Sequence, residues 1–154
     1  MLHRTYPDQD CSIARALEVA GERWSLLVLR DLMFGTHRFD ELQGGLGIAR
    51  NVLAARLDLL TEEGLVERRR YQEHPERFEY HLTAAGRDLA PALFQLMKWG
   101  DRYRPSAGGA PVRTPHRGCG GEVDWRLVCD RCHQQVTFAD LDLVRRTGER
   151  SFHS

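Results

Sequence analysis

Four residues near the C-terminal end of the chain have the types and spacing of a metal site. Two residues separate His116 from Cys119, and after a gap of nine residues Cys129 and Cys132 repeat that spacing. Structural zinc sites use thiolate and imidazole ligands, and a two-residue spacing lets both side chains of a tight turn reach one tetrahedral ion. The sequence therefore predicts a structural Zn²⁺ bound by His116, Cys119, Cys129 and Cys132.

Several alternatives to this zinc site stay open. His116 is the fourth ligand by spacing, but His133 competes with it. Cys129 and Cys132 could instead be a redox C-x-x-C pair, although no helix pattern follows them, or a disulfide, which a reducing cytoplasm disfavours. The segment could also hold no metal. Because four protein ligands leave no open coordination position, we expect a structural zinc and no enzymatic activity.

The segment around these ligands has the pattern of a small ribbon. Residues 122–128 alternate apolar and polar side chains like a strand, and Val136 and Phe138 could form a returning strand. A tail of about 40 residues has little room for a core, so a metal would supply the missing folding energy. These observations favour a zinc-ribbon-like tail.

A second group of residues could read DNA. The pattern over residues 48–63 predicts a helix whose buried stripe is Leu53, Leu57 and Leu60. The opposite face then carries Arg50, Asn51 and Ala54. An arginine fork can bind guanine, and an asparagine amide can pair with adenine. Arg56 lies at the edge of the stripe, where it could reach a phosphate or pair with an acid.

The elements around this helix predict the fold class. Helical patterns cover residues 12–20, 23–34 and 39–43, and a glycine turn at 44–47 leads to the helix at 48–63. Strand patterns at 66–71 and 78–82 predict a hairpin, and a last helix runs from near Thr83 to Tyr103, with a kink or a late start at Pro91. A helix, a turn and a second helix followed by a hairpin form a winged helix-turn-helix. We expect a mainly α-helical fold with a small antiparallel wing.

The predicted wing carries four candidate DNA-binding residues, Arg68, Arg69, Arg70 and Arg77. Side chains alternate between the two faces of a strand, so the three consecutive arginines cannot all face the same way. At least one of them could simply be solvated, or could pair with Glu67 or Glu79. Two roles therefore remain open for this triplet. The arginines could contact phosphates or a minor groove, or they could form an ordinary charged surface.

Length and composition define the organisation of the chain. Its 154 residues predict a winged helix-turn-helix domain at 1–104, a linker at 105–112 and the zinc-ribbon-like tail at 113–154. No apolar run is long enough to span a membrane and no signal peptide is visible, so we expect a cytoplasmic protein. The 22 basic and 22 acidic residues balance, which suggests weak non-specific DNA binding but leaves one basic face open.

Six motifs together resemble the HxlR family of bacterial winged helix-turn-helix regulators. They occupy residues 11–17, 21–32, 35–42, 60–66, 75–86 and 99–100, so the resemblance covers residues 11–103, about 60% of the chain. They include Gly21-Glu22-Arg23-Trp24-Ser25-Leu26-Leu27 and Pro75-Glu76-Arg77-Phe78-Glu79-Tyr80-His81-Leu82-Thr83. Together the motifs are highly specific, although each alone would be weak.

The resemblance implies a dimeric, sequence-specific transcriptional regulator. The homodimer would be built from the N-terminal and C-terminal helices and would bind a palindrome-like double-stranded DNA operator, with half-sites ~34–36 Å apart. Leu89, Leu93, Leu96 and Trp99 then become candidates for the dimer interface. The sequence does not identify a small-molecule effector.

Two positions qualify the resemblance. The family usually has Ser or Thr where this chain has Ala49, so a side-chain cap of the recognition helix is missing, at a cost of about 1 kcal/mol. Several members of the family resemble thiol sensors with a cysteine ahead of the first helix, and Cys11 lies there. A helix start lowers a thiol pKa, so Cys11 is a candidate redox sensor, although a buried or inert cysteine is favoured.

Two other classes of function compete with a DNA-binding regulator. The chain could be a zinc-ribbon interaction module whose winged helix contacts proteins. It could also be a thiol oxidoreductase that uses Cys129 and Cys132.

Overall fold

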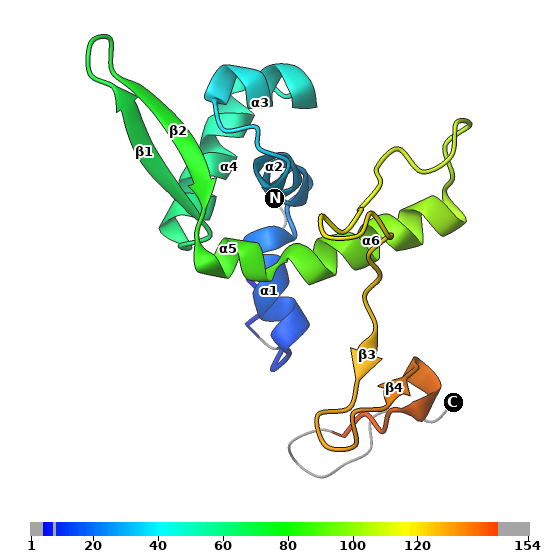
Figure 1. Ribbon diagram of the computed structural model, residues 1–154. Helices are drawn as coiled ribbons and strands as arrows, with labels where there is room; N and C mark the ends of the chain where they lie inside the picture. The colour runs from blue at the N-terminus through cyan, green and yellow to red at the C-terminus, as the bar shows by residue number, and fades with distance from the viewer. Residues whose placement is uncertain (1–4, 8, 145–154) are drawn as a thin grey trace. The chain divides into compact units, whose positions relative to one another are not determined.

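The computed structural model describes residues 5–7 and 9–144 (Figure 1). The chain divides into two compact units, of which the first ends at Trp99 and the second begins at Gly100. The division lies inside a helix, a few residues before the predicted linker at 105–112. The last ten residues of the predicted tail lie outside the described residues.

The first unit has the element order of a winged helix-turn-helix and confirms the expected fold class. Its elements are α1 (Ser12–Ala20), α2 (Ser25–Met33), α3 (Phe39–Leu46), α4 (Arg50–Glu62), β1 (Val66–Gln72), β2 (Arg77–Leu82), α5 (Ala84–Asp88) and α6 (Ala90–Tyr103). The helices α2, α3 and α4 contact one another around a common centre, and the β1–β2 hairpin extends away from them (Figure 1).

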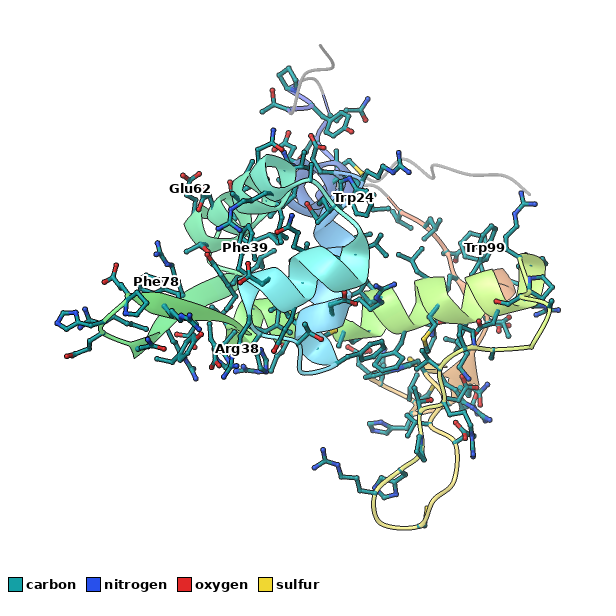
Figure 2. The ribbon with its side chains drawn as sticks, turned by 90° about the horizontal axis from the view of Figure 1, so that it is seen from above. Trp24, Arg38, Phe39, Glu62, Phe78 and Trp99 are labelled. Atoms are coloured by element: carbon teal, nitrogen blue, oxygen red, sulfur yellow. The ribbon has the colours of Figure 1, made fainter. Side chains whose placement is uncertain are left out.

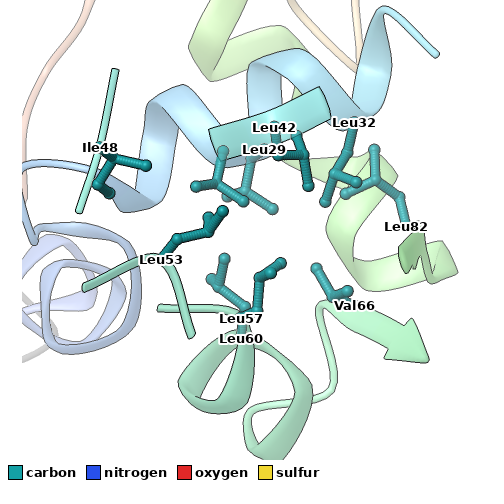
Figure 3. Close-up of a cluster of buried hydrophobic side chains, with 10 residues drawn as sticks. Leu29, Leu32, Leu42, Ile48, Leu53, Leu57, Leu60, Val66 and Leu82 are labelled. Carbon is teal, nitrogen blue, oxygen red and sulfur yellow. The ribbon is translucent and has the colours of Figure 1, made fainter. Parts of the chain in front are cut away.

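The core of this unit joins the helices to the base of the wing. Leu53, Leu57 and Leu60 of α4 are fully buried, as the apolar stripe predicts. They pack with residues of α2, α3 and both strands in a cluster completed by Val28, Leu29, Leu32, Leu42, Ile48, Val66 and Leu82 (Figure 3). Burial of these leucines fixes the rotation of α4 and therefore decides which of its residues face outward.

The turn between α3 and α4 is shorter than the sequence predicts. Gly44 and Gly45 continue α3, and the helix ends only at Gly47, whose φ of +61° is left-handed. Ala49 is the N-cap of α4 and makes no side-chain cap hydrogen bond, as expected for an alanine. The first N–H groups of α4 therefore lack a side-chain acceptor from the cap.

The predicted last helix is two helices in the structure. Thr83 caps α5, and its Oγ1 accepts a hydrogen bond of 3.2 Å from the Gly86 N–H. The helix is interrupted at Leu89, the C-cap of α5, and α6 begins at Ala90. Pro91 lies in the first turn of α6, where a missing N–H leaves no hydrogen bond unmade, so the late start is the correct alternative.

The wing is an antiparallel hairpin anchored to the helices. Val66 pairs with Leu82 at its base and Arg70 with Phe78 near its tip, and the register shifts between Arg70 and Gln72. The segment before α3 adds to β2, because the Tyr80 N–H donates to the His37 carbonyl oxygen at 2.8 Å. This pairing fixes the wing relative to the helix-turn-helix.

The second unit contains very little regular structure. Its elements after α6 are β3 (Leu127–Val128), β4 (Gln135–Val136) and the 3-10 helix η1 (Phe138–Asp140), and β3 and β4 form an antiparallel pair. Only the last two residues of the predicted strand 122–128 are in β3, and Phe138 begins η1 and not a strand. No residue described between 100 and 144 is buried.

No helix among the described residues is both long enough and apolar enough to cross a membrane.

Candidate nucleic-acid interface and candidate metal ligands

The N-terminal end of α4 presents the residues predicted to read bases. Arg50 and Asn51 are exposed, and Ala54 is half-buried on the following turn. The Arg50 side chain is 72% exposed, and its Nη1 lies 3.4 Å from Asp40 Oδ1. Its guanidinium also lies over the Phe39 ring, 4.7 Å from the centroid. These contacts hold the arginine beside α3, at the open end of the recognition helix.

Arg56 points in a different direction from Arg50. Its side chain is only 17% exposed, and its Nη1 lies 3.5 Å from Glu22 Oε2 in the loop between α1 and α2. Of the two roles open from the sequence, the structure places Arg56 in the ion pair with an acid. The Arg56 guanidinium is therefore less available to a DNA phosphate than the exposed guanidinium of Arg50.

The wing arginines are exposed, but acidic side chains accompany two of them. Arg69 pairs with Glu67, and Arg70 lies 3.3 Å from Glu76 and 3.7 Å from Glu73. These are solvent-exposed pairs, which contribute little to stability and exchange easily with another anion.

The two remaining wing arginines have no acidic partner of this kind among the described contacts. Arg68 lies over the Phe78 ring at 3.4 Å from its centroid, and Arg77 is exposed at the start of β2. Figure 2 shows Phe78 on the hairpin. The wing therefore carries positive charge on both of its faces, as the alternation of β1 requires.

Sequence reasoning missed Arg38, which links the helix-turn-helix to the wing. Its Nε donates to Glu79 Oε1 at 3.2 Å, and its guanidinium lies 4.9 Å from the centroid of the Tyr71 ring (Figure 2). The hydrogen bond from Arg38 lowers the pKa of Glu79. No local pattern in the sequence indicates this role, because Arg38 and Glu79 are 41 positions apart.

A cavity of about 500 Å³ lies at the base of the wing. His37 and His81 stack inside it with ring centroids 4.2 Å apart, and Arg69 and Arg87 contribute positive charge to its lining. Leu32, Met33 and Leu82 supply apolar surface. The cavity combines aromatic, cationic and apolar walls where the hairpin meets the helices.

The predicted dimer residues divide into two groups. Leu89 and Leu93 are half-buried and pack against the core cluster of their own chain. Leu96 and Trp99 of α6 are 54% and 56% exposed, and Ile13 and Leu17 of α1 are 70% and 43% exposed. The exposed apolar side chains lie on the two terminal helices that the family resemblance assigns to the dimer.

Cys11 occupies the N-cap position of α1 and is half-exposed. Hydrogen bonding from the backbone N–H groups of Ala14 and Ile13 lowers the pKa of its thiol, and the nearby Arg15 acts in the same direction. Asp10 opposes this shift. The helix start therefore favours the thiolate form of Cys11, as the sequence suggests.

The four predicted metal ligands form two separate pairs. His116 Nδ1 lies 3.4 Å from Cys119 Sγ, and the Cys129 thiol hydrogen-bonds with the side chain of Cys132. Hydrogen bonding from the Cys132 N–H, and to a smaller extent from the Arg131 N–H, lowers the pKa of Cys129. Within the described residues, no group of three or more such side chains comes together, so the structure does not join the two pairs.

Comparison with known proteins places these features in a family. Residues 19–107 match the model of the family described as HxlR-like helix-turn-helix. The chain is 49% identical over 126 residues to the uncharacterized HTH-type transcriptional regulator Rv3095 of Mycobacterium tuberculosis, a match that covers 82% of this chain and 80% of that protein. It is 37% identical over 90 residues to YvaP of Bacillus subtilis, covering 58% and 83%.

Two solved structures show how far the similarity extends. PA1607, described as a candidate transcription factor, superimposes with a TM-score of 0.78 at 35% identity and covers 88% of this chain and 95% of its own. The oxidized form of the redox regulator HypR has a TM-score of 0.57 at 32% identity, covering 61% and 98%. Residues 1–104 are only 104 of 154, or 68%, so the PA1607 match extends into the tail.

Proposed function

Because the chain belongs to the HxlR family of helix-turn-helix transcriptional regulators, we propose that it is a homodimer that binds a palindrome-like DNA operator. The observation that carries this proposal is the pair Arg50 and Asn51, exposed at the N-terminal end of α4. In a helix-turn-helix the first residues of the second helix lie nearest to the base edges of the major groove.

The chemistry of these two side chains suits base recognition. The Arg50 guanidinium can donate two parallel hydrogen bonds to guanine, and the Asn51 amide can pair with adenine. Ala54 is small enough to let the helix approach the groove or contact a thymine methyl group. Because Ala49 leaves the first N–H groups of α4 without a side-chain cap, they remain available to a DNA phosphate.

The wing arginines suit a different part of the DNA. Arg68, Arg69, Arg70 and Arg77 project from a hairpin beside the recognition helix, where phosphates of the adjoining backbone would lie. The acids that accompany Arg69 and Arg70 lower the net positive charge of the free wing. Non-specific binding is therefore weak, and specificity depends on α4 and on two half-sites bound together.

The experiment that tests this function compares two arginine variants on DNA. We expect Arg50→Ala to lose base discrimination by roughly 1–3 kcal/mol, because the variant can no longer form the bidentate contact. Arg69→Ala should instead weaken binding to all duplexes by a similar factor. Fluorescence anisotropy with a duplex obtained by selection from a random library, and with a scrambled duplex, measures both effects.

The same experiment can refute the proposal. Arg56→Ala is the matched control on α4, and it should leave the ratio of selected to scrambled affinity unchanged once the variant is shown to be folded. If wild-type protein binds the selected and scrambled duplexes equally, it is not a sequence-specific regulator. If Arg50→Ala keeps full discrimination, the proposed orientation of α4 is wrong.

We also propose that oxidation of Cys11 regulates DNA binding. The half-exposed thiol at the start of α1 and its lowered pKa support this, as does the similarity to the redox regulator HypR.

The thiol proposal makes a prediction about pH. A lowered pKa places more of Cys11 in the thiolate form at neutral pH, so its alkylation by iodoacetamide should reach half of its maximal rate at a lower pH in the folded protein than in the unfolded protein. Site-resolved mass spectrometry measures this rate. The same cysteine in urea-unfolded protein is the control, and a midpoint in the folded protein at or above the unfolded value would refute the prediction.

A further inference from the structure

The two ligand-bearing turns of the second unit share one backbone hydrogen-bond pattern. In the first, the His116 N–H donates to the Gly121 carbonyl oxygen at 2.7 Å, and the Gly120 N–H donates to the His116 carbonyl oxygen at 2.8 Å. In the second, the Cys129 N–H donates to Gln134 and the His133 N–H donates to Cys129, both at 3.0 Å. Each turn therefore closes a six-residue loop with the same two bonds.

The backbone dihedral angles support the same correspondence. The residue after the second candidate ligand is left-handed in both turns, with φ of +73° at Gly120 and +58° at His133. His133 is the only non-glycine with positive φ among the described residues, so the turn forces this conformation on it. His133 therefore corresponds to Gly120, and His116 corresponds to the ligand position of Cys129.

This correspondence separates the two competing histidines. His133 occupies the left-handed position at which its turn closes. In the first turn the same position is Gly120, which has no side chain that could bind a metal. His116 occupies the first ligand position, and its Nδ1 lies 3.4 Å from Cys119 Sγ. Two ligands about 2.1 and 2.3 Å from a tetrahedral Zn²⁺ lie roughly 3.6 Å apart, so this pair already has nearly the right separation.

The second pair is held by the same kind of turn as the first. The Cys129 N–H and carbonyl oxygen make the two hydrogen bonds that close this turn, and the Cys132 side chain lies beside the Cys129 thiol. Each turn is thus a half-site that holds two ligands. A zinc ion needs four, so neither turn can complete the coordination alone.

The rest of the second unit explains why the two half-sites would need an ion. No residue described between 100 and 144 is buried, and β3 and β4 are only two residues long. Apolar burial therefore contributes little to the stability of this unit, and small domains without a core usually depend on a metal or disulfides. Metal binding would supply free energy that the side-chain packing does not.

We propose that the second unit binds one structural Zn²⁺ through His116, Cys119, Cys129 and Cys132, and that His133 is not a ligand. The ion would join two half-sites that the structure shows apart, and its binding would release the protons of thiols that are still protonated. This proposal is independent of DNA recognition by the first unit.

Metal analysis of the full chain tests the proposal. Protein purified without chelators from zinc-supplemented cells should contain one zinc per chain, as measured by inductively coupled plasma mass spectrometry. Cys119, Cys129 and Cys132 should resist alkylation until zinc is removed by a chelator, whereas Cys11 should react at once. Cys129→Ser and His116→Ala should lose most of the zinc, and His133→Gly should keep one equivalent.

The outcomes that would overturn the proposal are equally clear. Zinc-free protein whose tail thiols are all reactive or disulfide-bonded would exclude the site. Loss of zinc in His133→Gly, a variant that suits the left-handed conformation and so should fold, would make His133 a ligand. Zinc retained by a dimeric protein but lost by a monomeric Leu96→Glu variant would mean that two chains share the ion. Helical circular dichroism of each variant shows that the first unit is folded.

Discussion

Replacing Leu96 with glutamate is expected to convert the proposed dimer to a monomer. Leu96 is 54% exposed on α6, and a carboxylate placed there would have to be buried without a partner if two such faces pack together. A dimer gains roughly 10²–10⁴ in operator affinity by binding two half-sites at once. We therefore expect the variant to sediment as a monomer and to bind the selected duplex at least about 100-fold more weakly.

Lys98→Glu is the matched control for this prediction. Lys98 lies two residues further along α6, and each residue turns the helix by about 100°, so it faces the opposite side from Leu96. The control introduces the same side chain and should remain dimeric. A Leu96→Glu protein that still sediments as a dimer, or a Lys98→Glu protein that dissociates, would show that this face of α6 is not the interface.

Replacing Gly86 with alanine is expected to destabilise the winged-helix unit strongly. Gly86 is buried in α5, and an added Cβ would lie far inside van der Waals contact with the Leu65 carbonyl oxygen and 3.1 Å from Leu82 Cδ2. The Leu65 oxygen is a backbone atom that also accepts a hydrogen bond from Thr83, so it cannot move away freely. Overpacking of this kind costs about 1–3 kcal/mol or more in unfolding free energy.

Gly100→Ala is the control, because among the described residues an added Cβ there meets no atom within 4 Å apart from its chain neighbours and the nearby backbone of its own helix. Gly100 lies inside α6, where alanine favours the helix by about 0.5–1 kcal/mol over glycine. Urea denaturation followed by circular dichroism should give a lower midpoint for Gly86→Ala and an unchanged or higher one for Gly100→Ala. Equal midpoints for Gly86→Ala and wild type would mean that α5 lies further from Leu65 than the structure shows.

The helices with a clear apolar period could be predicted from the sequence, because burial of one face decides both their existence and their rotation. Leu53, Leu57 and Leu60 are all buried, and Arg50 and Asn51 consequently face outward. The helical state of the glycines in the last turn of α3 could not be predicted in the same way. Gly44 and Gly45 disfavour a helix intrinsically, but packing of Leu42 and Leu46 with the core keeps them helical.

The partners of the arginines could not be predicted, since they depend on contacts between distant segments. Arg56 pairs with Glu22, which is 34 positions away, and Arg38 pairs with Glu79 across the junction of α3 and β2. Nothing in the local pattern at either position names the partner. The choice between His116 and His133 likewise needed backbone geometry, because the two turns have different residues at the left-handed position.

The paired acids on the wing have a consequence for the ion chemistry of DNA binding. In the proposed complex Arg69 or Arg70 would move to a phosphate and the DNA would release a condensed cation, but Glu67 or Glu76 would lose its arginine and attract a cation from solution. The two exchanges partly cancel, so the number of ions released would be smaller than the number of phosphates contacted. Affinity for the operator should therefore fall less steeply with added salt than four wing arginines alone would require.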